Sequence, residues 1–257
     1  MQGYGKDLIK LPCEGIALIV TDLHGNVHDF DKILELWKDL STNKNHLILT
    51  GDFIHAMDTS ENDHSLEILE AVKGHCQFDN FHLLLGNHEW ATITHRSVYK
   101  GGENQSTNFE GLLKNKFGAE WKHKLEEYVN FFKKLPVAIK TDNGVFISHS
   151  GPPKDVNSIK EIMNITEKGY SNNPLLFELL WNRYGDYTKK DVDNFLEKVG
   201  CKAMIVGHTP VDGYKLIRNQ LIVSSSFSKG KKAYVELDLE KEIRGGRDLK
   251  RMVKYFK

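Results

Sequence analysis

The sequence FHLLLGNHE, residues 81–89, places a short apolar run directly before Gly86, Asn87, His88 and Glu89. An apolar run of this length that ends in glycine predicts a buried strand, and open α/β sheets bind ligands beyond the carboxyl ends of their strands. The amide oxygen of Asn87 can ligate a hard divalent ion, and the imidazole of His88 can donate a proton near neutral pH. An isolated Asn-His pair at a strand end is more often part of a turn than of a catalytic site, so the interpretation depends on whether the pattern recurs.

The same pattern, an apolar run followed by ligand-type side chains, recurs at four other places. Residues 15–20 precede Asp22 and His24, whose side chains point the same way in an extended chain and can share one cation. The other three runs are residues 46–50 before Asp52, residues 145–148 before His149 and residues 203–206 before His208. Helical periods over residues 27–40 and 66–72 separate the first three strands, and this order predicts an α/β sheet with layered helices.

The rest of the chain adds further predicted elements. Residues 137–140 and 145–148 flank the turn Asp142-Asn143-Gly144 and predict a β-hairpin. Residues 214–217, 221–224 and 233–237 predict antiparallel strands that close a second sheet. Residues 100–108, KGGENQSTN, predict a flexible loop beside the site. Helices are expected over most of 91–134, around 157–163, 174–181 and 189–199, and on the surface in the basic tail, 240–257.

Length, charge and cysteine content restrict the class of protein. The 257 residues are 40% hydrophobic and show no internal repeat or linker, so a single domain over residues 1–257 is expected. Lys and Arg number 35 and Asp and Glu 35, a balance that argues against nucleic-acid or anionic-membrane partners. The three cysteines are widely spaced, no apolar run reaches the ~20 residues of a membrane span, and the first ten residues lack a signal-peptide core. We therefore expect a cytoplasmic protein.

The strand ends together offer six possible metal ligands with no thiol among them: Asp22, His24, Asp52, Asn87, His149 and His208. Oxygen and imidazole ligands suit Mn²⁺, Fe²⁺ or Zn²⁺ in a catalytic rather than a structural site. Six ligands are too many for one catalytic ion with an open position, but they fit two ions ~3.5–4 Å apart that share a carboxylate. Such a pair activates a bridging water and holds phosphoryl oxygens, which predicts direct attack on phosphorus. Each residue alone is as readily a turn aspartate or a core histidine, so the inference depends on the six together.

The ordered blocks resemble those of the calcineurin-like metallophosphoesterases, which are D-x-H, G-D, G-N-H, H and G-H. All are present in order, as Asp22-Leu23-His24-Gly25, Gly51-Asp52, Gly86-Asn87-His88-Glu89, Ser148-His149-Ser150-Gly151 and Gly207-His208. Finer features resemble the phosphoprotein phosphatase (PPP) branch of this family. These are the glutamate of GNHE, the helix start at residues 90–93, the SHSG block, Leu179-Leu180-Trp181 and Val211-Asp212-Gly213-Tyr214. The blocks span residues 22–214, which is most of the chain.

This resemblance implies an α/β (α+β) fold of two packed mixed β-sheets flanked by helices, and hydrolysis of phosphate monoesters. The first ion would be held by Asp22 and His24 and the second by Asn87, His149 and His208, with Asp52 bridging the two. A metal-bridging hydroxide would attack phosphorus, and His88 would be the general acid that protonates the leaving oxygen. Asn87 would also contact the substrate phosphate. The two divalent ions are expected to be Mn²⁺, with Fe or Zn as alternatives.

The sequence departs from the PPP pattern directly after Asp52. Where these phosphatases carry G-D-x-x-D-R-G, the chain has Gly51-Asp52-Phe53-Ile54-His55-Ala56-Met57. His55 replaces the carboxylate partner of the acid, so a protonated His88 would be less stabilised, and the acid is expected to be weaker or differently supported. Ala56 replaces an arginine that grips phosphate with two hydrogen bonds. Arg96 and Arg183 are the candidates to replace it, although each is also readily a surface or structural arginine.

The primary prediction is a serine/threonine protein phosphatase that acts on a phosphorylated protein or a small phosphoester. One alternative keeps the site but takes diadenosine tetraphosphate or another nucleotide as its substrate. A second alternative is a non-catalytic metal-binding scaffold in which the changes at His55 and Ala56 mark lost activity. The retained His88 argues against the scaffold, because metal binding alone would not need the acid. The native metal and the oligomeric state stay open.

Overall fold

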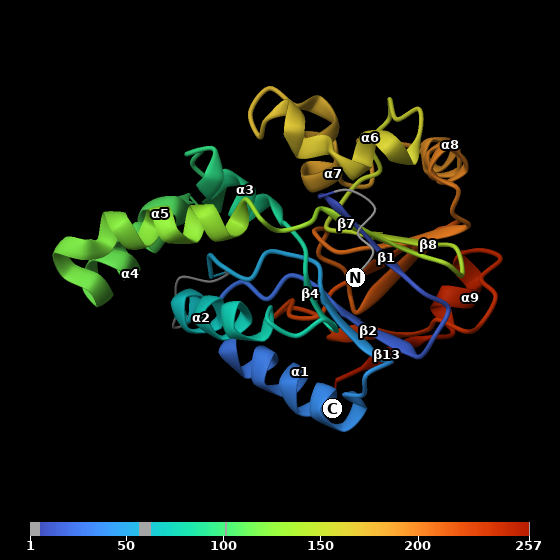
Figure 1. Ribbon diagram of the computed structural model, residues 1–257, viewed down its shortest axis with the longest axis horizontal. Helices are drawn as coiled ribbons and strands as arrows, with labels where there is room; N and C mark the ends of the chain where they lie inside the picture. The colour runs from blue at the N-terminus through green and yellow to red at the C-terminus, as the bar shows by residue number, and fades with distance from the viewer. Residues whose placement is uncertain (1–5, 57–62, 101, 257) are drawn as a thin grey trace.

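Two mixed β-sheets pack face to face, and helices cover their outer faces (Figure 1). The computed structural model describes residues 6–56, 63–100 and 102–256. Within these residues the six-stranded sheet has the order β1 (Leu8–Leu11), β7 (Ala138–Thr141), β8 (Val145–Ser148), β9 (Ala203–Val206), β11 (Gln220–Val223) and β10 (Tyr214–Ile217). The five-stranded sheet has the order β13 (Val253–Tyr255), β12 (Ala233–Asp238), β2 (Ile16–Val20), β3 (His46–Leu49) and β4 (Phe81–Leu83).

Alternating side chains along the central strands explain this packing. In β2, Ala17 and Ile19 belong to the apolar cluster between the two sheets, whereas Leu18 and Val20 belong to the cluster that the helices cover. The strands β3, β8 and β9 follow the same rule, with Ile48, Ile147 and Ile205 in the cluster between the sheets. Strands buried on both faces are continuous apolar runs in sequence, which is why these four could be located without a structure.

Helices lie on both outer faces of the pair of sheets, as Figure 1 shows. On one side are α1 (Val27–Leu40) and α2 (Ser65–His75), and on the other α6 (Ile159–Met163), α7 (Pro174–Trp181) and α8 (Lys189–Val199). At one end lie α3 (Asn87–Ile93), α4 (Gln105–Phe117) and α5 (Trp121–Phe132), and the 3-10 turn Gly118–Glu120 joins α4 to α5. A second 3-10 turn, Ile165–Lys168, lies between α6 and α7. The helices α1, α7 and α8 have the predicted bounds, because Asn26, Asn173 and Thr188 cap their first turns.

Several predicted elements are placed differently. The β10–β11 hairpin is antiparallel as predicted, but β12 joins the other sheet, where Val235 pairs with Ile19. The predicted tail helix is wrong over most of its length, because Gly245 and Gly246 begin a short helix, α9 (Gly246–Lys250), and β13 then pairs with β12. The strand β1, which pairs in parallel with β7, was not predicted.

The predicted loop over residues 100–108 is only partly irregular. The short strands β5 (Tyr99–Lys100) and β6 (Glu103–Asn104) pair with each other, while residue 101 lies outside the described residues. The helix α4 then begins at Gln105, because the Asn104 side chain accepts hydrogen bonds from the backbone N–H groups of Ser106 and Thr107. The segment therefore leads into a capped helix.

Parallel pairing brings the polar strand ends together. β2, β3 and β4 run parallel in one sheet, and β8 and β9 run parallel in the other. Because the carboxyl ends of parallel strands meet at one edge, the residues after all five strands can converge.

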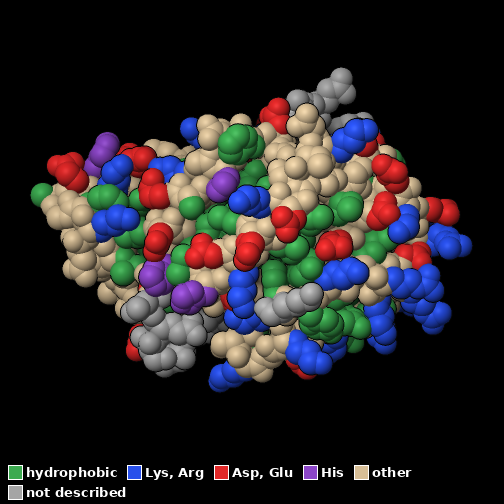
Figure 2. All heavy atoms as spheres, turned by 90° about the horizontal axis from the view of Figure 1, so that it is seen from below, with side chains coloured by type: hydrophobic (Ala, Val, Ile, Leu, Met, Phe, Trp, Pro, Cys, Tyr) green, Lys and Arg blue, Asp and Glu red, His purple; other side chains and the backbone are tan. Residues whose placement is uncertain are grey.

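No helix in the described residues is long and apolar enough to cross a membrane. On the face shown in Figure 2, acidic and basic side chains are interspersed, with basic ones gathered toward one end.

We expect Ile48→Ala to lower the free energy of unfolding by about 2–5 kcal/mol, because it leaves a cavity between the two sheets. Ile48 is fully buried there, on a strand flanked by β2 and β4. The measurement is urea unfolding followed by circular dichroism. The control is Lys254→Ala on the edge strand β13, an exposed residue whose loss should change stability by less than about 0.5 kcal/mol. Equal effects of the two substitutions would contradict the packing described here.

Candidate metal centre

All six predicted ligands and His88 lie directly beyond the ends of parallel strands. Asp22 and His24 follow β2, Asp52 follows β3, Asn87 and His88 open α3 after β4, His149 follows β8 and His208 follows β9. Every one of these side chains is buried except that of Asp22, which is partly exposed. The edge of the two sheets therefore holds a cluster of buried carboxylates and imidazoles.

The backbone at this cluster is held in an uncommon conformation. Asp22, His24, Asp52 and His208 have positive φ angles of 51°, 47°, 55° and 62°, in the left-handed region that side chains other than glycine rarely adopt. Hydrogen bonds tie these turns to one another. The His24 N–H donates to the Asp52 carbonyl at 2.8 Å, and the His208 N–H donates to the Asp22 carboxylate at 2.9 Å. The first bond joins two turns of the five-stranded sheet, and the second joins turns of different sheets, so contacts between loops hold these conformations in place.

Glycines next to the ligands allow the turns to approach closely. A Cβ atom on Gly207 would lie 2.1 Å from Asp22 Oδ2, and one on Gly86 would lie 2.3 Å from the backbone nitrogen of Asp52. Neither distance can be accommodated without moving backbone or a ligand carboxylate. The glycines of the G-N-H and G-H blocks are therefore required by packing around the ligands.

The Asp52 carboxylate lies at the centre of the cluster. Its Oδ2 atom is 3.5 Å from His149 Nε2, 3.7 Å from His24 Nε2 and 3.9 Å from His88 Nε2. These separations are long for hydrogen bonds, but they suit ligands that each lie ~2.0–2.2 Å from a shared cation. The described residues form two groups able to hold an ion, His24 with Asp52 and His88, and Asp52 with His149 and His208. The two groups share Asp52, which is consistent with a dimetal site.

Hydrogen bonds fix which imidazole nitrogens face the cluster. His149 Nδ1 donates to the Thr50 carbonyl at 3.0 Å, and His24 Nδ1 donates to the His55 carbonyl at 3.1 Å. A metal-binding histidine usually donates its second N–H in this way, which leaves its Nε2 lone pair for the ion. Burial lowers the pKa of His149 and lowers that of His208 well below its ordinary value, so both are neutral and can bind metal. The residues present therefore fit divalent ions.

The two remaining predicted ligands lie at the rim of these groups. Asn87 Oδ1 is 2.8 Å from His149 Nε2, so it can join the second group. Asp22 accepts from the His208 backbone and lines a small cavity with His24 and His208. The structure adds His88 as a possible ligand of the first group, whereas the resemblance implied only an acid role for it.

Glu89 is a buried carboxylate that organises the backbone around Asp52. Its two oxygens accept from the N–H groups of Asp52, Phe53, Ile54 and Gly86, at 2.9–3.4 Å. Burial and the neighbouring Asp52 raise the pKa of Glu89 to about 8, while the N–H donors act in the opposite direction. The sequence analysis assigned Glu89 no role. Its place three residues after Gly86, the position of a capping-box glutamate, is the signal that could have suggested one.

The position that departs from the PPP pattern lies behind His88. His55 Nδ1 is 2.9 Å from His88 Nδ1, so the two rings are in hydrogen-bonding contact. Burial lowers the pKa of His55 to about 3, and that of His88, which is also close to His24, is lowered well below its ordinary value. Ala56 is buried, and Met57 lies outside the described residues.

The two candidate arginines have different surroundings. Arg183 borders a cavity of about 370 Å³ together with His24, Asp52, Asn87 and His88, and its Nε lies 3.2 Å from His208 Nε2.

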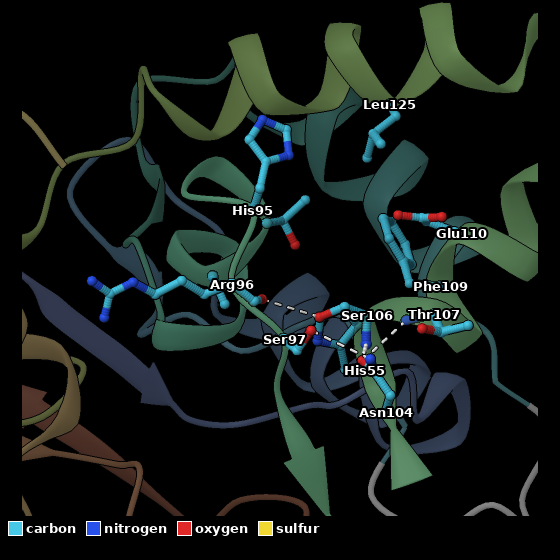
Figure 3. Close-up of a pocket in the computed structure, with 12 residues that line it drawn as sticks. His55, His95, Arg96, Ser97, Asn104, Ser106, Thr107, Phe109, Glu110 and Leu125 are labelled. Atoms are coloured by element: carbon cyan, nitrogen blue, oxygen red, sulfur yellow. Dashed lines mark hydrogen bonds between the residues drawn. The ribbon is translucent and has the colours of Figure 1, made fainter. Parts of the chain in front are cut away.

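Arg96 lines two other cavities, and its guanidinium lies 5.1 Å from the centre of the Trp90 ring. Figure 3 shows the Arg96 side chain directed away from the other residues around it. The structure thus brings Arg183, and not Arg96, to the cavity beside the ligands. Tyr99 and Trp181, which sequence reasoning did not assign to the site, also border it.

Comparisons with known proteins agree with this geometry. The family model described as calcineurin-like phosphoesterase matches residues 17–212. A probable serine/threonine-protein phosphatase of Encephalitozoon cuniculi is 26% identical over 241 residues, which cover 85% of this chain and 48% of that protein. The chain thus spans about half the length of this curated relative.

Solved structures share the fold at low sequence identity. A Saccharomyces cerevisiae structure, described as a protein serine/threonine phosphatase with similarity to human phosphatase PP5, has a TM-score of 0.69 at 18% identity. The match covers 90% of this chain and 76% of the yeast chain. A cold-active protein-tyrosine phosphatase of a Shewanella species has a TM-score of 0.64 at 18% identity, over 90% of this chain and 78% of that chain. With its buried His and Asp ligand groups and the family match over most of its length, the chain belongs to the calcineurin-like phosphoesterase family.

Proposed function

We propose that this chain is a PPP-type serine/threonine protein phosphatase that hydrolyses phosphate monoesters with two bound divalent ions, for which we propose Mn²⁺. The observation that carries the proposal is one cavity of about 370 Å³ in which His88 and Arg183 lie beside the ligands around Asp52. Metal-assisted hydrolysis of a phosphomonoester needs a proton donor, a cationic side chain that binds phosphate and a set of metal ligands in one cavity. His88, Arg183 and the ligands around Asp52 are the residues proposed for these roles. The Encephalitozoon and yeast relatives are described as serine/threonine phosphatases, which supports a serine/threonine substrate. The Shewanella protein is a tyrosine phosphatase, so phosphotyrosine is a necessary comparison.

The mechanism follows from the positions of the side chains. Ions held by these ligands would supply an activated water and hold phosphoryl oxygens. Asp52 is oriented for this role by the His88 backbone N–H, which donates to its Oδ1 at 3.0 Å and leaves Oδ2 toward the imidazoles. The Arg183 guanidinium borders the same cavity and can bind phosphoryl oxygens through two N–H groups. His88 Nε2, which faces the cavity beside Asp52, donates a proton to the departing oxygen.

Metal removal and two substitutions test the reaction. We expect a chelator to stop hydrolysis of a phosphoserine peptide and added Mn²⁺ to restore it. Asp52→Asn should abolish turnover because both ligand groups lose their shared carboxylate. His88→Asn should reduce kcat by ~10²-fold or more through loss of the acid.

The readout is phosphate release from phosphoserine, phosphothreonine and phosphotyrosine peptides and from diadenosine tetraphosphate, with metal content measured on each sample. Turnover of the dinucleotide alone would keep the mechanism but contradict the substrate assignment. Two bound ions with no hydrolysis of any substrate would contradict the proposal and favour a non-catalytic scaffold.

The two arginines provide a matched pair of substitutions. We expect Arg183→Ala to lower kcat/KM for a phosphopeptide by about 10- to 100-fold, because a hydrogen bond to a charged group contributes ~1.5–3 kcal/mol. Arg96→Ala should change it by less than about 3-fold, since Arg96 contacts Trp90 away from the cavity. Steady-state kinetics on one peptide compare the two variants. A larger loss from Arg96→Ala would show that the phosphate-binding arginine has been misassigned.

A further inference from the structure

The part of the chain after the last candidate ligand is strongly basic. Residues 209–257 contain 12 Lys and Arg and 6 Asp and Glu, although the whole chain is balanced at 35 of each. This segment forms β10, β11, β12, α9 and β13. Figure 2 shows basic side chains gathered toward the end of the molecule at which Figure 1 places α9. An excess of one charge on one side of a neutral protein attracts partners of the opposite charge.

One lysine of this segment lies close to the catalytic cavity of about 370 Å³. His208 and Pro210 border that cavity, and the chain then runs into β10, in which Lys215 is the second residue. Lys215 Nζ lies 5.3 Å from the centre of the Tyr184 ring. Tyr184 directly follows Arg183, which also borders the cavity. The positive charge that Arg183 brings to the cavity therefore continues outward to Lys215.

A second lysine, Lys231, is joined to β10 by a pair of tyrosines. Lys231 Nζ lies 5.7 Å from the centre of the Tyr255 ring, which is 6.4 Å from the ring of Tyr214 at the start of β10. Gly213 allows this approach, since a Cβ atom there would lie 2.7 Å from Tyr255 Cε1. β10 and β13 are edge strands of different sheets, so the contact brings the two edges into one surface. The four residues Tyr184, Lys215, Lys231 and Tyr255 are called the β10 surface.

The two lysines of the β10 surface carry charge that is available to a partner. Both side chains are exposed, and within the described part of the chain no carboxylate forms an ion pair with Lys215 or Lys231. Two carboxylates lie nearby and are bound to backbone. Asp186 accepts from the Arg183 N–H, and Asp212 accepts from the Lys231 N–H, both at 2.7 Å. An anionic partner would thus meet two ammonium groups that no ion pair neutralises.

The tyrosines prepare these lysines for binding. Tyr184 and Tyr255 are 41% and 45% exposed, and each has a lysine ammonium over its ring. A cation–π contact leaves the lysine its full charge and restricts its side chain, so less conformational entropy is lost when an anion binds. Exposed tyrosines are also enriched where proteins contact other proteins. The β10 surface therefore has the composition of a site for an acidic polypeptide.

We propose that the β10 surface binds acidic residues that flank the phosphorylated residue of the substrate, and that the protein consequently prefers acidic phosphoproteins. This inference rests on the proposed function, in which a phosphorylated protein places its phosphate in the catalytic cavity. An extended peptide spans ~3.3–3.6 Å per residue, so residues a few positions from the phosphoserine can reach from Arg183 to Lys215. The charges contribute both to encounter and to binding, and salt screens them.

Two phosphoserine peptides of equal length test the inference. One has glutamates on both sides of the phosphoserine, and the other has glutamine at the same positions. We expect the metal-loaded wild type to have a kcat/KM about 5-fold higher for the glutamate peptide at ~0.05 M salt, since an exposed ion pair changes an equilibrium constant by up to ~5-fold. The preference should disappear at ~1 M salt, where the Debye length is only about 3 Å.

Charge reversal at the two lysines should remove this preference. In the double variant Lys215→Glu/Lys231→Glu the new carboxylates repel the glutamate peptide, whereas kcat/KM for the glutamine peptide should change by less than about 3-fold. The matched control is Lys116→Glu/Lys122→Glu. These lysines are also exposed and lie over aromatic rings, each 5.7 Å from the ring centre, on α4 and α5 at the opposite end of the molecule from α9 (Figure 1). The control should keep the wild-type preference.

The outcomes distinguish the inference from the proposed function. A wild-type protein that hydrolyses neither peptide would refute the proposed function, and with it the inference. Hydrolysis of both peptides without a preference, or an equal loss of preference in the control variant, would refute only the inference. Binding of a single-stranded oligonucleotide is measured by fluorescence anisotropy on the same proteins. Oligonucleotide binding that the Lys215→Glu/Lys231→Glu variant loses, with no preference between the peptides, would overturn the inference in favour of a nucleic-acid partner.

Discussion

The buried carboxylate of Asp52 is the constraint on which the rest of the structure depends. A carboxylate that is 1% exposed is costly to bury unless positive charge or N–H groups compensate it. The chain supplies the His88 N–H to one oxygen and places three imidazole nitrogens 3.5–3.9 Å from the other. The shared carboxylate and these imidazole nitrogens together form a donor set that suits a divalent cation. The two sheets, their parallel strand ends and the glycines beside them all serve to bring these groups to one point.

The positions of the candidate ligands around Asp52 depend on a strained backbone that hydrogen bonds hold in place. Left-handed conformations at residues other than glycine cost of order 1–2 kcal/mol each, and four ligands adopt them. Hydrogen bonds between the turns and the four N–H groups gathered by Glu89 hold the strained loops in place. Ligand geometry is therefore set by contacts between loops, and it does not depend on any one strand.

The sequence alone was sufficient to predict those strands and helices that are determined by residues close together in the chain. Strands such as β2 and β9 were predicted from their continuous apolar runs, and the helices expected at 174–181 and 189–199 begin at residues that Asn173 and Thr188 cap. The six candidate ligands were chosen because each follows an apolar strand, and parallel strands that end at one edge bring such residues together. The partner of β12 could not be predicted, because its pairing with β2 joins residues more than 200 positions apart in the chain. Contacts such as His55 with His88, and the place of Arg183 beside His208, likewise arise only when separate loops meet.

The span of the ligands along the chain has a consequence for biosynthesis. The bond from the His208 N–H to the Asp22 carboxylate closes a loop across 186 residues of sequence separation. Contacts this distant form slowly because chain entropy must be lost before they contribute. On the ribosome the first ligands emerge long before the last, so the polypeptide carries exposed carboxylates and imidazoles without a finished pocket for much of its synthesis. The second candidate group, Asp52 with His149 and His208, would therefore be able to hold an ion only after residue 208 has been added.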